Sequence, residues 1–193
     1  MIEHTTIDGI NYGPLAALVG VWKGDKGVDR APEPDGEERN PFYETITFEA
    51  AGDVTNAEQQ TLSIVRYHQV VSRKSNDEVF HEQLGFWLWD PADDTIVETF
   101  VIPRGVAVVA GGKLAQPTDL LQELIFDVAA DANSPEFGIV QAPFMFKQAK
   151  TTAFTHCMTV CGQHMQYTES TILDIYDKKS YDHKDVNSLR RVD

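Results

Sequence analysis

Hydrophobic and polar residues alternate along most of the chain with the two-residue period of a half-buried β-strand. Residues 41–50, PFYETITFEA, show the pattern well, because Phe42, Ile46 and Phe48 fall on one face and polar side chains fall on the other. A helical period is almost absent, and only residues 13–20, GPLAALVG, predict a turn or two of helix. The segments that predict strands are 41–50, 60–74, 78–90, 95–103, 104–114, 119–130, 139–147, 151–160, 163–177 and 189–192.

Short connections join nearly all of these segments. Residues 75–77 and 91–94 carry the Ser, Asn, Asp and Pro residues that favour tight turns between antiparallel strands. A meander of about ten strands removes its exposed edges most simply by closing on itself. We therefore predict an all-β protein, an up-and-down antiparallel barrel with a short N-terminal helix. A packed sandwich is the main alternative.

The chain is long enough for one sizeable core, since it has 193 residues, of which 42% are hydrophobic. We expect one domain over residues 1–193. Residues 25–40, DKGVDRAPEPDGEERN, contain two prolines and no aromatic residue, which predicts a solvated loop at one barrel mouth and no domain boundary.

The formal net charge is −14 and the sequence pI is about 4.7. Such an acidic surface repels nucleic-acid backbones and anionic headgroups, so neither nucleic acid nor a membrane is expected as a partner. No run of 18 apolar residues is present. Residues 1–13 lack the apolar centre of a signal peptide, and we expect a cytoplasmic protein.

None of the six histidines has the spacing of a preassembled zinc site, and no nucleophile elbow or phosphate-binding glycine loop is found. A site that needs one histidine ligand, such as a haem with a single proximal histidine, stays open. His183 lies in a polar C-terminal segment that by itself is typical of a solvated tail. Glu44 and Glu169, if buried, would need partners such as Arg66.

Residues 79–90, VFHEQLGFWLWD, place His81 on one face of a strand, together with Gln83, Gly85 and two tryptophans. The pattern alone favours His81 as a half-buried structural histidine with a backbone or glutamate partner. The opposite face is also largely apolar, so periodicity does not show which face is internal. A strand with two apolar faces indicates an additional cover on the outside, for which a homodimer interface is one candidate.

Three segments, in order, resemble the nitrobindin family. They are LAALVGVWKGDKG (15–27), with its Gly20, Trp22 and Gly24, then PFYETITF (41–48), and finally FHEQLGFW (80–87). VETF (97–100) and GVAVVAGGKL (105–114) continue the likeness. The resemblance implies a ten-stranded haem-binding barrel that is similar to fatty-acid-binding proteins and lipocalins.

The resemblance also implies a site. His183 matches the family's proximal histidine, the only protein ligand of the iron, and His81 matches a histidine on the open side of the haem pocket. Haem b would then support nitric oxide binding and peroxynitrite isomerisation. Lys184 and Asp185, however, replace the pattern that usually follows the proximal histidine. Two alternatives stay open: a barrel that binds a small hydrophobic ligand such as a fatty acid without haem, and a barrel with a solidly packed interior.

Several further residues receive roles from the same resemblance. Lys26 would lie at the barrel opening beside the haem propionates. Gly20 and Gly24 would allow close backbone approach at the pocket wall, and Gly85 would leave room beside His81. Trp22 is expected to fill the closed end of the barrel.

Overall fold

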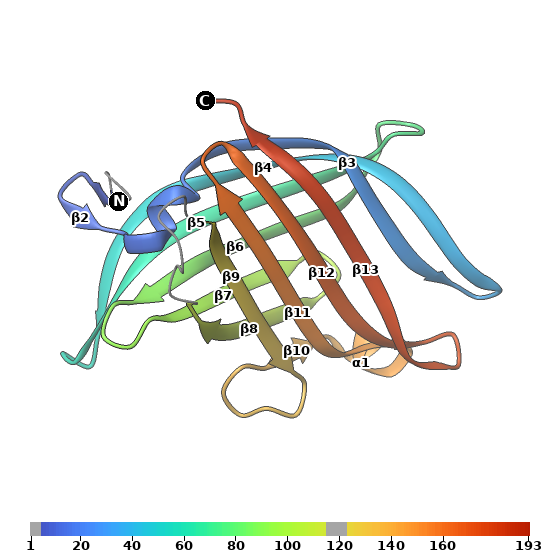
Figure 1. The fold of residues 1–193 in the computed structure, drawn as a ribbon. Coiled ribbons are helices and arrows are strands. Elements are labelled where there is room, and N and C mark those ends of the chain that lie inside the picture. The colour runs from blue at the N-terminus through green and yellow to red at the C-terminus, as the bar shows by residue number, and fades with distance from the viewer. Residues whose placement is uncertain (1–4, 115–122) are drawn as a thin grey trace.

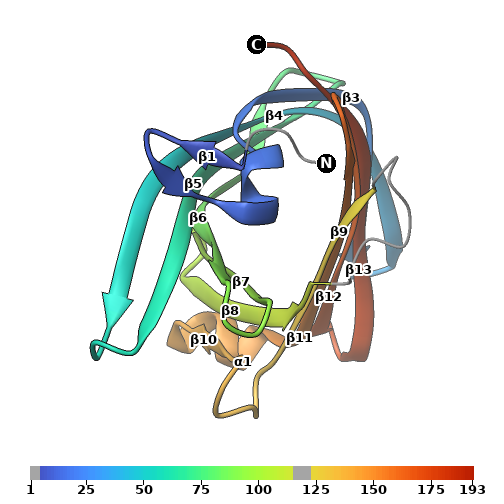
Figure 2. The same ribbon diagram turned by 60° about the vertical axis from the view of Figure 1, so that its left-hand side comes forward.

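The computed structural model describes residues 5–114 and 123–193, and the chain forms a closed, ten-stranded antiparallel β-barrel (Figures 1 and 2). The prediction of an all-β barrel with a short N-terminal helical segment is confirmed. The barrel strands are β3 (Gly20–Glu33), β4 (Gly36–Asn56), β5 (Gln60–Arg73), β6 (Val79–Asp90), β7 (Thr95–Ile102), β8 (Val106–Lys113), β9 (Leu124–Asp131), β11 (Ala149–Cys161), β12 (His164–Ile175) and β13 (Lys178–Arg191).

The barrel closes in two places. Strands β3 to β8 each pair with the next strand, and β13 returns to pair with β3. On the other side β11 pairs with β9, and the pair Gly111 and Ala129 joins β8 to β9. The short strand β10 (Ile139–Gln141) pairs with β8, and a small hairpin of β1 (Thr6–Ile7) and β2 (Ile10–Asn11) precedes the barrel.

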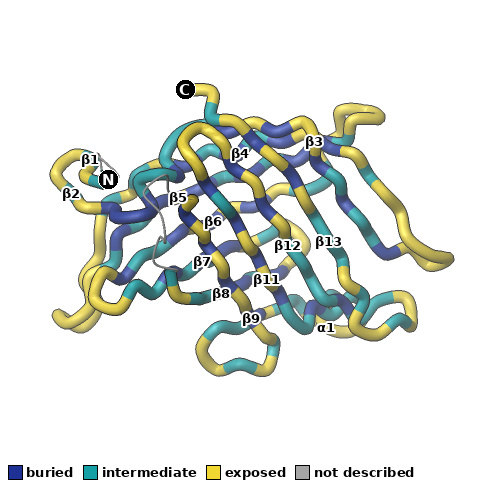
Figure 3. Tube along the Cα trace, viewed as in Figure 1, coloured by how far each residue is buried: buried dark blue, intermediate teal, exposed yellow. Residues whose placement is uncertain are grey.

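Strand alternation builds the core. In β9, LIFDVAAD, every second residue is buried and the residues between them are exposed, as Figure 3 shows along most strands. The inner faces of the strands thus supply one continuous cluster of side chains. This is the arrangement that a two-residue period predicts for a sheet closed around its own interior.

One end of the barrel is filled by the 3₁₀-helix η1 (Gly13–Ala17). Leu15, Leu18 and Trp22 are fully buried there, and the Trp22 indole Nε1–H donates to the Leu18 carbonyl at 2.7 Å. Gly13 has φ +51°, and a Cβ atom at this position would lie 2.3 Å from the Trp89 ring, so only glycine fits. We call this the η1 end, and the other the His183 end.

The prediction of a solvated loop over residues 25–40 is wrong. Strand β3 continues to Glu33 and β4 begins at Gly36, so the segment is a long hairpin that extends from the barrel in Figure 1. Its outer part has polar residues because water reaches both sides. The Arg30 guanidinium and the Glu37 carboxylate form a cross-strand ion pair at 2.8 Å in this hairpin.

Two other predicted strands differ from the structure. Only Ile139–Gln141 of the segment 139–147 is a strand, and Pro143 then begins the short helix α1 (Pro143–Gln148), where its fixed φ suits the first turn. The final strand begins at Lys178, well before residue 189. The first four residues of the predicted strand 119–130 lie outside the described residues.

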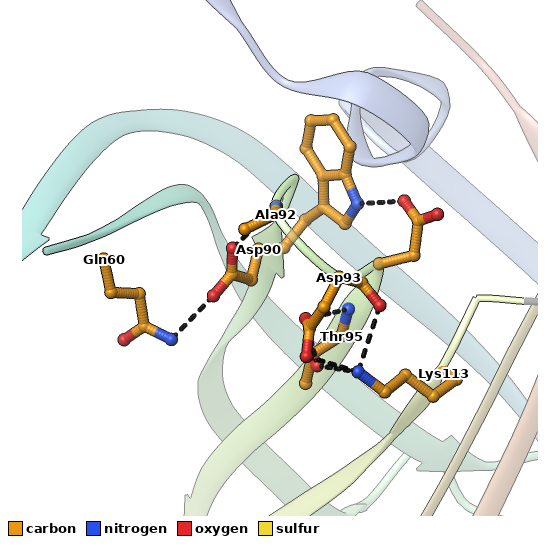
Figure 4. A network of polar contacts seen from close by, with 8 residues as sticks. Gln60, Asp90, Ala92, Asp93, Thr95 and Lys113 are labelled. Atoms are coloured by element: carbon orange, nitrogen blue, oxygen red, sulfur yellow. Dashed lines mark hydrogen bonds and ion pairs between the residues drawn. The ribbon is translucent and has the colours of Figure 1, made fainter.

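The predicted turn at residues 91–94 joins β6 to β7 and is held by side chains (Figure 4). The Asp90 carboxylate accepts hydrogen bonds from the Gln60 amide at 2.7 Å and from the Ala92 backbone at 2.9 Å. Asp93 pairs with Lys113 of β8. Among the described residues, no helix is long and apolar enough to cross a membrane.

Candidate functional site

Four ionisable residues form a row across the inside of the barrel. Asp29 of β3 lies opposite Asp185 of β13, Asp185 lies opposite Glu169 of β12, and Glu169 lies opposite His156 of β11. Directly opposed residues of antiparallel strands have Cβ atoms roughly 5 Å apart, so each side chain is close enough to interact electrostatically with the next one in the row. The row links the His183 end to the barrel centre.

His183 is in β13, on the same face as Asp185, and belongs to the last strand instead of preceding it. Its Nε2 atom lies 2.7 Å from Asp29 Oδ1 and 3.6 Å from Asp185 Oδ2. Burial opposes the charged imidazole, but the hydrogen bond to Asp29 and the charge of Asp185 outweigh it and raise the pKa of His183. The side chain is 28% exposed, so solvent reaches the ring.

His81 shares this end of the barrel with His183. The face of β6 that carries His81, Gln83 and Trp87 is the inner one, and Gln83 and Trp87 are each 1% exposed. Burial lowers the pKa of His81, and the positive charges of Arg104 and His183 lower it further. His81 is therefore a neutral, largely buried imidazole whose pKa is lowered in part by the positive charge of His183.

A second polar cluster lies at the barrel centre. Glu98, which is fully buried, accepts hydrogen bonds from the Tyr67 hydroxyl at 2.7 Å and from His156 Nδ1 at 2.9 Å. Gln83 in turn donates to the Tyr67 oxygen. His156 Nε2 has no hydrogen-bond partner within the described part of the chain.

His156 borders a cavity of about 10 Å³, which is room for roughly one water molecule. Both polar and apolar side chains line it: Ile46, Phe48, Tyr67, Gln69, Trp87, Glu98, His156, Met158, Tyr167 and Glu169.

The charges of this cluster are strongly coupled. Burial disfavours the imidazolium of His156, but the adjacent Glu98 carboxylate and two further glutamates raise its pKa to about 9. Burial raises the pKa of Glu169 to about 8, and the charges of Asp185 and Glu98 act in the same direction. At neutral pH the centre therefore holds a protonated His156 beside a mostly protonated Glu169.

The predicted partner of the buried glutamates is wrong. Arg66 pairs with exposed Glu49 on the outer surface at 2.9 Å. Glu44 is instead held by two amides, Gln69 Nε2 at 2.6 Å and Asn187 Nδ2 at 2.7 Å. Amide donors satisfy a buried carboxyl group without adding a second charge.

The three glycines of the predicted site are in close contact with side chains and backbone of neighbouring segments. A Cβ atom on Gly24 would lie 2.7 Å from Asn187, and one on Gly20 would lie 2.7 Å from Asp193. At Gly85 the Thr99 carbonyl and the Tyr67 ring take up the space, so no room is left beside His81. These three positions are needed for close contacts between neighbouring strands.

Lys26 lies in a bulge of β3 on the outside of the barrel. It borders a groove over the outer faces of β11, β12 and β13, where Cys157, Gln166 and Val186 are exposed. Its backbone N–H donates to Asn187 Oδ1 at 3.2 Å. The side chain is therefore away from the interior, whereas the sequence predicted a position at the barrel opening.

Sequence reasoning missed Asp29, Asp185, Glu98 and His156 as parts of the site. Asp29 was placed in a loop, and the other three have no motif around them. The available signal was the two-residue alternation of side chains along a strand. It places Tyr167, Glu169 and Leu173 on one face of a strand, and it places Asp185, Asn187 and Leu189 on one face of another. Ionisable residues among inward positions indicate a polar interior.

A closed ten-stranded barrel with one end filled and an inward histidine on its last strand defines the class of ligand-binding β-barrels. The family model described as "THAP4-like, heme-binding beta-barrel domain" matches residues 11–191, and the chain belongs to this family. The family resemblance seen in the sequence is thereby confirmed. A search of curated proteins finds no significant match.

A solved structure shares the fold. It is the crystal structure of Rv2717c from M. tuberculosis, with a TM-score of 0.67 and 16% sequence identity, and the likeness covers 93% of this chain and 95% of that chain. At this identity the comparison shows a common barrel fold.

At the His183 end, the imidazole of His183 is the group that could hold a haem iron. His183 offers a single inward imidazole that solvent reaches, and one such ligand is sufficient. Within the described residues its Nε2 atom makes one hydrogen bond, to Asp29, and an iron bond would replace it. Phe42 and Phe80 pack edge to face on this half of the barrel, with their ring centroids 6.3 Å apart. The central cavity of about 10 Å³ does not admit a porphyrin.

Proposed function

We propose that this chain binds haem b at the His183 end of the barrel, where His183 Nε2 would hold the iron. The observation that carries the proposal is the position of His183, an inward and partly solvent-exposed imidazole at the same end as the buried, neutral His81. Membership of a haem-binding family supports it.

His183 and His81 would have different roles at this site. His183 must give up its hydrogen bond to Asp29 and act as a neutral donor, since a protonated imidazole cannot bind iron. His81 is neutral and can exchange a hydrogen bond with a small molecule on the opposite side. When bound, the haem supplies the centre for nitric oxide binding and for isomerisation of peroxynitrite to nitrate.

Titration of the purified protein with hemin tests this proposal. We expect a Soret shift with one equivalent of hemin, and a His183→Ala variant should lose the histidine-ligated spectrum and bind at least about tenfold more weakly, or about 1.4 kcal/mol. His164→Ala is the matched control, because His164 is exposed at the η1 end. A shift that is the same in all three proteins would exclude His183 as the ligand.

A small hydrophobic ligand without haem is the alternative function. The central cavity argues against a fatty acid, because Glu98, Glu169 and His156 border it and it holds about one water molecule. An apolar chain there would leave buried charges without compensation.

The outer surface supports a homodimer as a further part of the proposal. Leu84 of β6 lies opposite Val101 of β7, and this apolar row continues through Ala107 to Val140 of β10. Leu84, Val101 and Val140 are 50%, 53% and 74% exposed. Because the net charge is −14, an uncharged face is where two copies repel each other least.

Sedimentation of the wild-type chain and of a Leu84→Lys variant tests the dimer. We expect a wild-type dimer that dissociates in the variant, because isologous contact would place two lysines in an apolar interface. An Arg66→Lys change, on an exposed residue of the adjacent strand, should leave the dimer intact. A monomeric wild-type protein contradicts this part of the proposal.

A further inference from the structure

We propose that Asp29, His183 and Asp185 form a binding site for one divalent transition-metal ion, such as Zn²⁺. One ligand atom of each residue lies within 4.8 Å of the other two. A nitrogen and two carboxylate oxygens form a donor set that Zn²⁺ accepts at about 2.0–2.2 Å from each atom. The site requires no porphyrin, so the inference goes beyond the proposed function and stands without it.

The sheet holds the three side chains together before any ion binds. Asp29 and Asp185 are directly opposed in the β3–β13 pair, and His183 precedes Asp185 by two residues on the same inward face. Side chains two residues apart on a strand project in the same direction. Two paired strands thus supply all three ligands, and no loop needs to fold over the ion.

Outer hydrogen bonding orients one of the carboxylates. Asn40 Nδ2 donates to Asp29 Oδ2 at 3.1 Å, which leaves Asp29 Oδ1 directed at His183 Nε2. Carboxylates that bind metals are commonly fixed in this way by a second residue. Asp185 has no hydrogen bond in the described part of the chain, and its side chain is 23% exposed, so its oxygens are accessible from solvent.

The two carboxyl groups at this position also favour the binding of a cation. Asp29 is 3% exposed, and among the described residues His183 is the only cationic side chain within ion-pair distance of Asp29 or Asp185. The two carboxyl groups face each other at a largely buried place, where burial raises the pKa of Asp185 to about 7. A divalent ion would stabilise both groups as carboxylates, which a single imidazolium does only in part.

Metal and haem should exclude each other, because both require His183 Nε2. This mutual exclusion rests on the proposed function. Three protein ligands leave at least one position of the ion for water, as in zinc sites that are not purely structural.

Calorimetric titration of chelator-treated protein with ZnCl₂ tests the site. We expect one ion per chain, and affinity should fall at least about tenfold in Asp29→Asn and in Asp185→Asn, because each change removes a charged ligand. Asp182→Asn is the matched control: Asp182 is on the same strand, but it is exposed and paired with Lys184 at 3.2 Å. An unchanged affinity in the two site variants, or an equal loss in the control, would overturn the proposal.

Co²⁺ provides a readout that needs no variant. In the wild-type protein, bound Co²⁺ should give visible absorption bands that differ from those of the aqueous ion, and equimolar ZnCl₂ should remove them. A spectrum identical to that of aqueous Co²⁺ would contradict the site. This measurement decides the question if an asparagine variant does not fold.

Hemin titrations of the same proteins separate this inference from the proposed function. The Asp182→Asn control should keep both the His183-dependent Soret band and Zn²⁺ binding, and saturating Zn²⁺ should weaken hemin binding to the wild type. Zn²⁺ binding without any Soret band would reject the haem proposal alone. A Soret band without Zn²⁺ binding would reject the metal site alone.

Discussion

Glu98→Ala is expected to lower the free energy of unfolding by about 3–5 kcal/mol, the usual loss when one partner of a buried ion pair is removed. The change leaves His156 charged or unsatisfied in the barrel centre, and it leaves the Tyr67 hydroxyl without its acceptor. For a chain of this length, that corresponds to a fall in Tm of roughly 6–20 °C. Thermal unfolding followed by circular dichroism at pH 7 measures it.

Glu49→Ala is the matched control. Glu49 also pairs with a basic residue, Arg66, but both side chains are more than half exposed, so the expected loss is about 0–1 kcal/mol. A double variant, Glu98→Ala with His156→Phe, should recover part of the stability, because it also removes the stranded imidazole. If Glu98→Ala is no more destabilising than Glu49→Ala, the central cluster does not stabilise the barrel as described.

The barrel fold could be predicted from the local alternation of hydrophobic and polar residues. Residues 41–50 and 95–103 alternate cleanly because one face meets a dry interior and the other meets water. The pattern failed over residues 25–40, where the hairpin projects beyond the barrel and the buried positions of β3, Gly27, Asp29 and Pro32, carry no large apolar side chain. It failed again at residues 142–147, where a proline followed by aromatic residues suits a short exposed helix as well as a strand.

The site was predicted only in part. His183 and His81 came from a family resemblance, and the structure places them at one end of the barrel. Their polar neighbours came from neither source, because Asp29 and Asp185 are 156 residues apart in the chain and meet only when β13 closes the barrel against β3. A single sequence contains no signal for that closure, since register between distant strands depends on the whole fold.

Stability should fall as the pH rises from about 5 to about 9, because several buried groups, Glu169 and His156 among them, bind their protons more tightly in the folded state. The pKa of Glu169 is raised to about 8 and that of His156 to about 9. A raised pKa gives stability that is complete below the unfolded-state pKa and is lost as the pH rises through the folded-state pKa. The Glu169 contribution is thus lost between about pH 4.5 and 8, and the His156 contribution between about 6.5 and 9.

The Glu169→Gln variant isolates the first of these two groups. Glutamine resembles the protonated glutamate, so the variant and the wild type should have similar unfolding free energies near pH 5. Above pH 8 the wild type must hold a buried carboxylate beside Asp185 and Glu98, and the variant should become more stable than the wild type by a few kcal/mol, since one pKa unit equals about 1.4 kcal/mol. Urea unfolding of both proteins at pH 5, 7 and 9 measures the difference.

Glu136→Gln, an exposed glutamate in the connection between β9 and β10, controls for the loss of one negative charge from an acidic protein. Its difference from the wild type should stay within about 0.5 kcal/mol at every pH, as for surface substitutions in general. A Glu169→Gln difference that is equally flat from pH 5 to 9 would mean that Glu169 is solvated in the folded protein. The row from Asp29 to His156 would then be broken at Glu169, and the two ends of the barrel interior would titrate independently.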